Sequence, residues 1–209
     1  IAPGVRDVLL TGKVKEAVTR TVDGRRVYDA VVLDAPPTGR VGRFLNVTAE
    51  TARLTRVGPI KTQSEGVATV LRSPMTAVHV VTLLEEMPVQ ETADAIAELQ
   101  QLKLPVGSII VNATQPPLLR RGRVTRAEVR RGLLAAGLPA GREVVAGLVE
   151  QADAYLQRQA LEDALRAELA ALGRPLVELP LLPNGVRPAD LYDLARILLE
   201  APSPAGRPS

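Results

Sequence analysis

An aspartate at the end of a short apolar run is the first place in this sequence where chemistry could occur. Residues 28–34 read Tyr-Asp-Ala-Val-Val-Leu-Asp, and a Pro/Gly segment, 35–39, follows them. This pattern predicts a buried strand with Asp34 at its carboxyl end. Open α/β sheets bind ligands at that edge, where a carboxylate can hold Mg²⁺ directly or through water. The same aspartate could instead cap a helix or form a turn.

Gly39 follows in the same loop and could share this chemistry. Because glycine has no Cβ, its backbone N–H can closely approach the γ-phosphate of a nucleotide. Asp34 and Gly39 together therefore predict a site for Mg²⁺ and phosphate.

The rest of the sequence predicts the elements that must position these residues. Apolar runs predict strands at 76–83, 107–112 and 175–179, and a helix at 88–103 with Pro88 in its first turn. Strand, helix and strand with short links form the unit of a parallel sheet. Apolar periodicity and breakers predict further helices at 5–18, 40–72 with a break at Gly58-Pro59, 125–136, 142–172 and 188–199. The expected fold class is α/β, a mostly parallel sheet flanked by helices.

Composition agrees with this fold and narrows the chemistry. Of 209 residues, 46% are hydrophobic, but only one Phe, three Tyr and no Trp are present, so Leu, Val, Ile and Ala must build the core. Zero cysteines and one histidine exclude disulfides, a thiolate nucleophile and a thiolate zinc site. No apolar run reaches the ~18 residues needed to span a bilayer, so we expect a cytoplasmic protein, peripheral to the membrane at most.

Residues 28–40, taken whole, resemble the switch II element of the ArsA-type P-loop ATPases. This family includes the arsenite-pump ATPase and the ATPase that targets tail-anchored membrane proteins. Its usual loop reads Asp-Thr-Ala-Pro-Thr-Gly-His. The chain keeps four of these residues and changes three, namely Asp34, Pro37, Thr38 and Gly39 against Ala35, Pro36 and Arg40. The resemblance implies catalytic roles for Asp34, Thr38 and Gly39, with Asp34 also organising Mg²⁺ and the other two sensing the γ-phosphate of ATP.

A second stretch, 76–114, is similar to the family's strand, helix and strand. Its helix carries Glu91-Thr92 and its last strand ends in Val111-Asn112. The resemblance implies that Asn112 binds the adenine edge, since its amide offers a donor and an acceptor. Without the resemblance, Asn112 could simply turn the chain at the end of a strand.

A third stretch, 179–187, resembles the family's loop before its last helix, where apolar side chains cover the adenine. Leu182, Pro183 and Val186 are the implied contacts. A Pro-Gly segment, Pro3-Gly4, also matches, so the resemblance runs from residue 3 to about residue 199. It implies a P-loop NTPase fold of the SIMIBI type, lacking its N-terminal P-loop strand.

No phosphate-binding P-loop is present in these residues. Gly12-Lys13 is not one, because Asp7 and Val14 stand where the motif needs Gly and Ser/Thr, so Lys13 is expected on a solvated helix. We expect an upstream portion to carry the P-loop, and the chain alone not to hydrolyse ATP. One unit is predicted over 1–200, with a disordered tail at 201–209.

The resemblance implies an ATPase that uses ATP and Mg²⁺ and couples hydrolysis to anion transport or membrane-protein targeting. Implied partners are a homodimer, or a heterodimer with a paralogous ATPase, and a membrane protein or hydrophobic cargo. The changed switch loop leaves open a non-catalytic partner subunit of an active paralogue. A doubly wound binding domain without a nucleotide role is a further alternative.

Three other features have simpler interpretations. The arginines of segment 120–131 have no interleaved aromatics for base stacking, so a solvated or partner-facing surface is expected and no nucleic acid. His79 is expected in the core of its strand. Glu85 and Glu86 are expected to cap the helix at Pro88, with a place near a dimer interface as the alternative.

Overall fold

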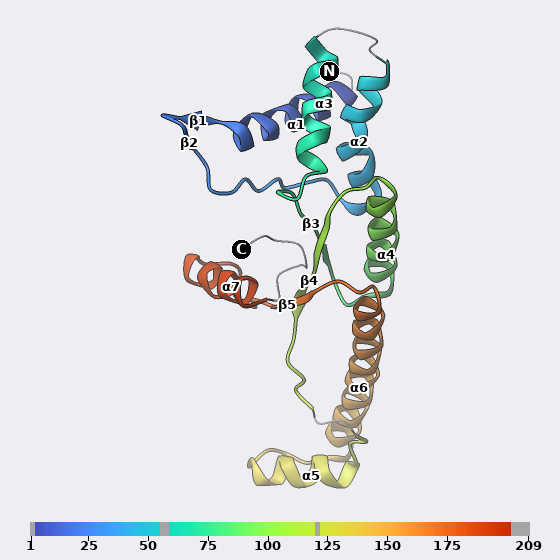
Figure 1. The fold of residues 1–209 in the computed structure, drawn as a ribbon. Helices are drawn as coiled ribbons and strands as arrows, with labels where there is room; N and C mark the ends of the chain where they lie inside the picture. Colours follow the sequence, from blue (N-terminus) through green and yellow to red (C-terminus); the bar gives the residue numbers. More distant parts are fainter. Residues whose placement is uncertain (1–2, 55–58, 120–121, 202–209) are drawn as a thin grey trace.

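The protein has an α/β architecture built on a three-stranded parallel sheet, as predicted (Figure 1). The computed structural model describes residues 3–54, 59–119 and 122–201, with side chains within 10–46, 64–119 and 122–201. The strand order is β3 (Val78–Thr82), β4 (Val106–Thr114) and β5 (Leu176–Pro180). The three predicted strands at 76–83, 107–112 and 175–179 are therefore confirmed.

Helices surround this sheet at the places that apolar periodicity and breakers predict. α4 (Glu86–Gln101) connects β3 to β4, and Pro88 lies in its first turn. The predicted 40–72 helix is two helices; of the predicted break, Pro59 begins the second helix and Gly58 lies outside the described residues. The other helices are α1 (Pro3–Thr19), α2 (Thr38–Leu54), α3 (Pro59–Leu71), α5 (Arg126–Ala135), α6 (Arg142–Ala171) and α7 (Pro188–Glu200).

The main core lies on one face of the sheet, under α4 and α6. Ile109 and Val111 of β4 are fully buried there in one cluster with Leu99 of α4 and Leu169 of α6. On β5, Val177 points to the opposite face and is also buried, because α7 packs against this strand. Figure 1 shows α7 on the opposite side of the sheet from α4 and α6. Branched aliphatic side chains thus form the contacts between helices and sheet on both faces, as the scarcity of aromatic residues requires.

Turn residues end several elements where the sequence places them. Asp23 and Gly24 both have positive φ, 50° and 76°, which suits the two-residue turn of the small hairpin β1 (Thr21–Val22) and β2 (Arg25–Arg26). At the end of α6, Gly173 has φ 67°, a conformation that glycine adopts without strain.

The predicted buried strand at 28–34 is wrong. These residues run extended between β2 and α2 without strand pairing, and Val32 is 92% exposed. A strand is stable only when its backbone N–H and C=O groups pair with a neighbour, and no described strand lies beside 28–34. Leu33 alone packs against the core. The β-branched apolar run therefore predicted the extended conformation of 28–34 correctly, but it did not predict whether the segment pairs with a neighbouring strand.

His79 is not in the core, contrary to expectation. It lies on β3 but points to the face that the described helices leave open, where Val81 is also exposed. Its Nδ1 accepts a hydrogen bond from the Ser108 N–H at 3.1 Å. A Cβ on Gly107 would stand 2.8 Å from the imidazole Cε1, so glycine makes room for the ring. Successive side chains of a strand point to opposite faces of the sheet, and this alternation, rather than the hydrophobicity of the run, decides on which face His79 lies.

The two glutamates before Pro88 behave only partly as expected. Glu86 begins α4, where its charge suits the helix N-terminus. Glu85 occupies the N-cap position, but its side chain makes no capping hydrogen bond. No helix in the described part of the chain is both long and apolar enough to cross a membrane. Residues 202–209, predicted as a disordered tail, lie outside the described residues.

Candidate functional site

A bulge at the carboxyl end of β4 exposes Asn112. Between the paired positions Val111–Glu178 and Thr114–Pro180, β4 has one residue more than β5. Ala113 takes up the irregularity with φ 57°, a conformation unusual outside glycine. Asn112 is exposed while its neighbour Val111 is fully buried. Bulges re-aim side chains at sheet ends, and this one leaves the amide available to a ligand.

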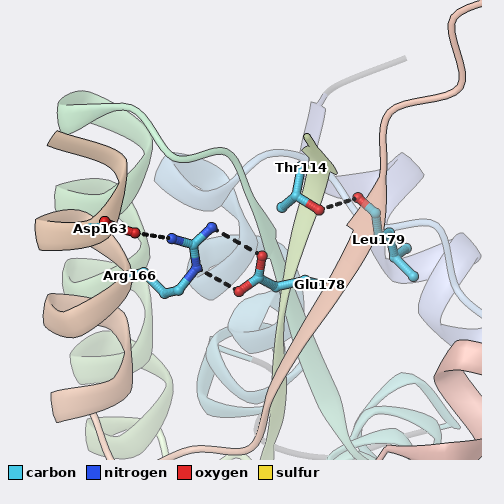
Figure 2. Close-up of polar contacts among 5 residues, drawn as sticks. All are labelled: Thr114, Asp163, Arg166, Glu178 and Leu179. Carbon is cyan, nitrogen blue, oxygen red and sulfur yellow. Dashed lines mark hydrogen bonds and ion pairs between the residues drawn. The ribbon is translucent and has the colours of Figure 1, made fainter. Parts of the chain in front are cut away.

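Hydrogen bonds hold the end of β4 against the start of the 181–187 loop. The Thr114 hydroxyl donates to the Leu179 carbonyl at 3.2 Å, as Figure 2 shows. The Leu181 N–H in turn donates to the Thr114 carbonyl at 2.8 Å. The strand that carries Asn112 and the loop that carries the predicted apolar contacts are therefore fixed side by side.

The predicted adenine-covering residues lie in a turn just beyond this junction. The Gly185 N–H donates to the Leu182 carbonyl at 3.2 Å, and Gly185 has φ 75°. Leu182 is half-buried, whereas Pro183 and Val186 are exposed. These residues thus gather with Asn112 at the carboxyl edge of the sheet, where α/β folds bind ligands.

An open cleft of 640 Å³ lies at the same edge. It extends between the end of β4, β5, α6 and α7. Its lining combines prolines and one aliphatic side chain with polar groups, namely Thr114, Gln115, Pro116, Pro117, Arg166, Glu178, Pro180 and Ile197. None of Asn112, Leu182, Pro183 and Val186 lines this open cleft.

An ion-pair network that sequence reasoning missed forms one wall of this cleft. Arg166 of α6 binds Glu178 of β5 through two hydrogen bonds, Nε to Oε1 at 2.6 Å and Nη2 to Oε2 at 3.2 Å (Figure 2). Its Nη1 donates to Asp163 at 3.1 Å. The hydrogen bond to Glu178 raises the pKa of Arg166. The guanidinium is thus already paired with carboxylates, and its role is to fix α6 on β5. A glutamate inside the short apolar strand Leu176–Pro180 was the available signal.

A second polar arrangement begins α7, directly after Val186. Asp190 accepts hydrogen bonds from the Arg187 backbone N–H at 2.9 Å and from the Arg187 Nε at 3.0 Å. These bonds lower the pKa of Asp190 and raise that of Arg187. A carboxylate in the first turn satisfies a backbone donor and suits the helix dipole. The 182–187 loop therefore enters α7 through a fixed turn.

The predicted phosphate-sensing residues lie at the start of α2. The helix begins at Thr38, whose hydroxyl donates to the Glu91 carboxylate of α4 at 3.3 Å. One turn later, α2 touches α4 so closely that a Cβ on Gly42 would overlap the carboxylate of Glu98. A Cβ on Gly39, in contrast, would meet no protein atom within 4 Å, and the residue is exposed. The loop is thus joined mechanically to α4 while Gly39 stays accessible.

Asp34 offers an exposed carboxylate just before this helix. An exposed oxygen ligand suits Mg²⁺, which keeps several waters and takes one or two protein carboxylates together with phosphate oxygens. Within the described residues, no side-chain hydrogen bond or ion pair joins Asp34 to Asn112. The structure therefore assembles Asn112, Leu182, Pro183 and Val186 at one edge, and Asp34, Thr38 and Gly39 separately at the start of α2.

Lys13 is confirmed as a solvated helix residue. It lies on α1, its side chain is 81% exposed, and its Nζ pairs with Glu16 at 3.4 Å. A P-loop lysine would instead follow a strand and a glycine-rich turn.

Comparison with known proteins finds relatives whose names contain the word ATPase. No protein-family model matches the chain. The ATPase BagA of Mycobacterium tuberculosis strain H37Rv is 46% identical over 209 residues, which cover 96% of this chain and 62% of the relative. A Mycobacterium bovis protein that is also named an ATPase has the same identity and coverage. The chain thus spans less than two-thirds of the length of the curated relatives it matches.

Proposed function

We propose that this chain forms the switch and base-binding part of an ArsA-type ATPase that uses ATP and Mg²⁺. The observation that carries the proposal is the bulge at the end of β4, which presents Asn112 beside the 181–187 loop at the carboxyl edge of a parallel sheet. The names of the two mycobacterial relatives support ATP as the ligand. The phosphate cradle is to be sought in the part of those relatives that lies outside the alignment.

Each residue would have a defined task in such an enzyme. The Asn112 amide would donate to and accept from the adenine edge, while Leu182, Pro183 and Val186 would exclude water from the ring. The Asp34 carboxylate would accept hydrogen bonds from waters around Mg²⁺, and the Gly39 N–H would donate to a γ-phosphate oxygen. Bound Mg²⁺ would neutralise charge on the phosphates.

The contact between α2 and α4 would carry the nucleotide state away from the site. A shift of Thr38 and Gly39 toward a phosphate would move α2, whose first turn is held to Glu91 and packs on Glu98. Such a two-state helix can couple hydrolysis to work on a partner. The work proposed is anion transport or membrane-protein targeting by a cytoplasmic homodimer, or a heterodimer with a paralogous ATPase, acting at the membrane surface.

The alternative is a non-catalytic subunit that pairs with an active paralogue. It rests on the changes at Ala35, Pro36 and Arg40 in the switch loop. Arg40 is exposed beside Gly39 and differs in shape and charge from the family's histidine. Under this alternative the protein binds ATP but does not turn it over.

Steady-state ATP hydrolysis by the full-length product of the gene tests the proposal. Asp34→Asn should abolish turnover, whereas Asp29→Asn, an exposed aspartate of the same extended segment, should leave it unchanged. Asn112→Ala should weaken ATP binding by about 10-fold, the value of one good hydrogen bond in a dry site. Gln101→Ala, an exposed amide at the end of α4, is its control.

Three outcomes separate the possibilities. Turnover that is lost on Asp34→Asn supports the ATPase. ATP binding without turnover supports the partner-subunit alternative. ATP binding that is indifferent to Asn112→Ala contradicts the base-binding role assigned to this edge.

A further inference from the structure

α5 buries no side chain and lies far from the sheet. The helix packs against α6, and every one of its residues is exposed or half-buried. Figure 1 shows it at the end of α6 that points away from β4 and β5. Its own capping box stabilises it, since the Glu128 carboxylate accepts from the Thr125 N–H at 2.8 Å and the Thr125 hydroxyl at 2.7 Å. The helix is therefore a formed but largely uncovered surface.

The sequence around this helix concentrates the positive charge of the protein. Residues 118–138, which we call the basic segment, contain six arginines and one glutamate, a formal charge of +5. The whole chain carries +3, so the remaining residues carry +3 minus +5, or −2. The single glutamate, Glu128, is occupied by its cap. The basic segment is thus strongly positive while the rest of the sequence is slightly acidic.

The outward face of α5 carries three exposed arginines, Arg126, Arg130 and Arg131, and one exposed leucine. Val129 and Leu133 are half-buried, and Leu134 is 60% exposed. On a helix, residues three and four apart are neighbours, so Leu134 lies between Arg130 and Arg131. Both arginines are exposed, and within the described residues neither forms an ion pair with a carboxylate. This face offers free cations around an apolar side chain.

Two more exposed leucines extend this surface. Leu118 is 77% exposed before α5, and Leu138 is 53% exposed after it. Arginine pairs with phosphate oxygens in a bidentate manner, and leucine partitions into the boundary between headgroups and acyl chains. Base stacking on nucleic acid would need aromatic side chains, and the basic segment has none. The pattern matches an anionic bilayer better than a nucleic acid.

We propose that the basic segment docks the protein on the surface of an anionic phospholipid bilayer. Arg123, Arg126, Arg130 and Arg131 contact the headgroup phosphates, and Leu134 and Leu138 enter the interface between them. This inference deepens the membrane-surface work proposed above by naming the surface that binds. Docking needs no nucleotide, so a lack of vesicle binding would contradict the docking proposal alone, and a lack of ATP turnover would contradict the ATPase proposal alone.

Vesicle flotation of the purified protein without nucleotide tests the docking. The protein should float with vesicles that contain phosphatidylglycerol and not with vesicles of phosphatidylcholine alone. A triple variant, Arg126→Ser, Arg130→Ser and Arg131→Ser, should weaken binding by on the order of 100-fold, from about fivefold per arginine at the surface. Raising salt from about 0.1 M to about 1 M should release the protein, because the Debye length falls to about 3 Å.

Controls distinguish this surface from general charge. A matched triple variant, Arg25→Ser, Arg43→Ser and Arg158→Ser, removes three exposed arginines from other elements and should float like the unaltered protein. Leu134→Ser should also weaken binding at low salt, because it removes an apolar side chain from the bilayer interface. Far-UV circular dichroism verifies that each variant is folded.

Several results would overturn the proposal. The first is that the protein does not float with phosphatidylglycerol vesicles. The others are that both triple variants lose the same amount of vesicle binding, or that the first triple variant still floats. Tight binding of a single-stranded oligonucleotide, lost in the first triple variant and without vesicle flotation, would assign the arginines to nucleic acid instead.

Discussion

Arg166→Met removes the guanidinium that joins α6 to β5. The substitution keeps the length of the side chain but leaves Glu178, 34% exposed, without its two hydrogen bonds, and Asp163 without one. Breaking a buried pair by removing one partner costs about 3–5 kcal/mol, and an exposed pair contributes about 0–1 kcal/mol. With both side chains about one-third exposed, the loss lies between these limits, at about 2 kcal/mol.

Urea unfolding followed by circular dichroism measures this loss. A change of about 2 kcal/mol in the free energy of unfolding corresponds to a fall in Tm of about 4–8 °C for a chain of this size. Arg196→Met is the matched control, because its pair with Asp193 has a similar 2.9 Å distance but both side chains are 66% exposed. The control should lose less than about 0.5 kcal/mol.

A double variant completes the test. Arg166→Met with Glu178→Met replaces both charges by apolar side chains and should recover most of the stability, since the Glu178 carboxylate no longer remains without its partner. The reasoning is refuted if Arg166→Met and Arg196→Met lose the same stability, or if the double variant is less stable than Arg166→Met alone.

Three further predictions concern the core, the start of α7 and the contact between α2 and α4. Leu169→Ala, at a fully buried position, should lower the free energy of unfolding by about 2–5 kcal/mol in urea titrations, whereas Leu199→Ala, 85% exposed, should change it by less than about 0.5 kcal/mol. The pKa of Asp190 is lowered in the folded state from its ordinary value of 3.8, so its stabilising effect is present above that value and is lost as pH falls through the lower folded pKa. Urea midpoints of the unaltered protein and Asp190→Asn should therefore differ at neutral pH and converge in acid; a constant difference would contradict this. Gly42→Ala should change the free energy of unfolding by less than about 1 kcal/mol, because the gain in helix propensity offsets the displacement of the exposed Glu98 carboxylate. Adding Glu98→Ala removes that carboxylate, so the double variant should be more stable than Gly42→Ala by about 1 kcal/mol in the same urea titrations.

Local signals predicted the elements of this fold well. Pro88 in the first turn of α4 and Gly173 after α6 are set by the chain's own covalent geometry, which sequence alone determines. The prediction of a strand at 28–34 was wrong because a strand needs a neighbouring strand to pair with, and that is a property of the sheet and not of the segment. The prediction that His79 lies in the core was wrong for a related reason, because helices distant in sequence decide which face of β3 is covered.

The candidate site was only partly predictable. Asn112 and the 182–186 loop were identified through a resemblance, and both follow the carboxyl ends of neighbouring strands, which Thr114 joins through hydrogen bonds to Leu179 and Leu181. The bulge at Ala113 could not be predicted, because it arises from the register between β4 and β5. Likewise, the pairing of Arg166 with Glu178 requires that α6 fold back on β5, and no local pattern encodes that contact. The roles of Asn112, of the 182–186 loop and of Asp34, Thr38 and Gly39 all stay predictions.

α6 behaves mechanically as a lever with a short clamped end. Its 30 residues form a rod of about 45 Å, clamped near Leu165, Arg166 and Leu169, while the end at Arg142 lies about 35 Å from that clamp. A tilt of about 10° at the clamp would displace the far end, and α5 with it, by about 6 Å. Small motions at the sheet would thus be amplified into large displacements at the far end of α6, and the stiffness of that transmission depends on the clamp formed by Leu165, Arg166 and Leu169.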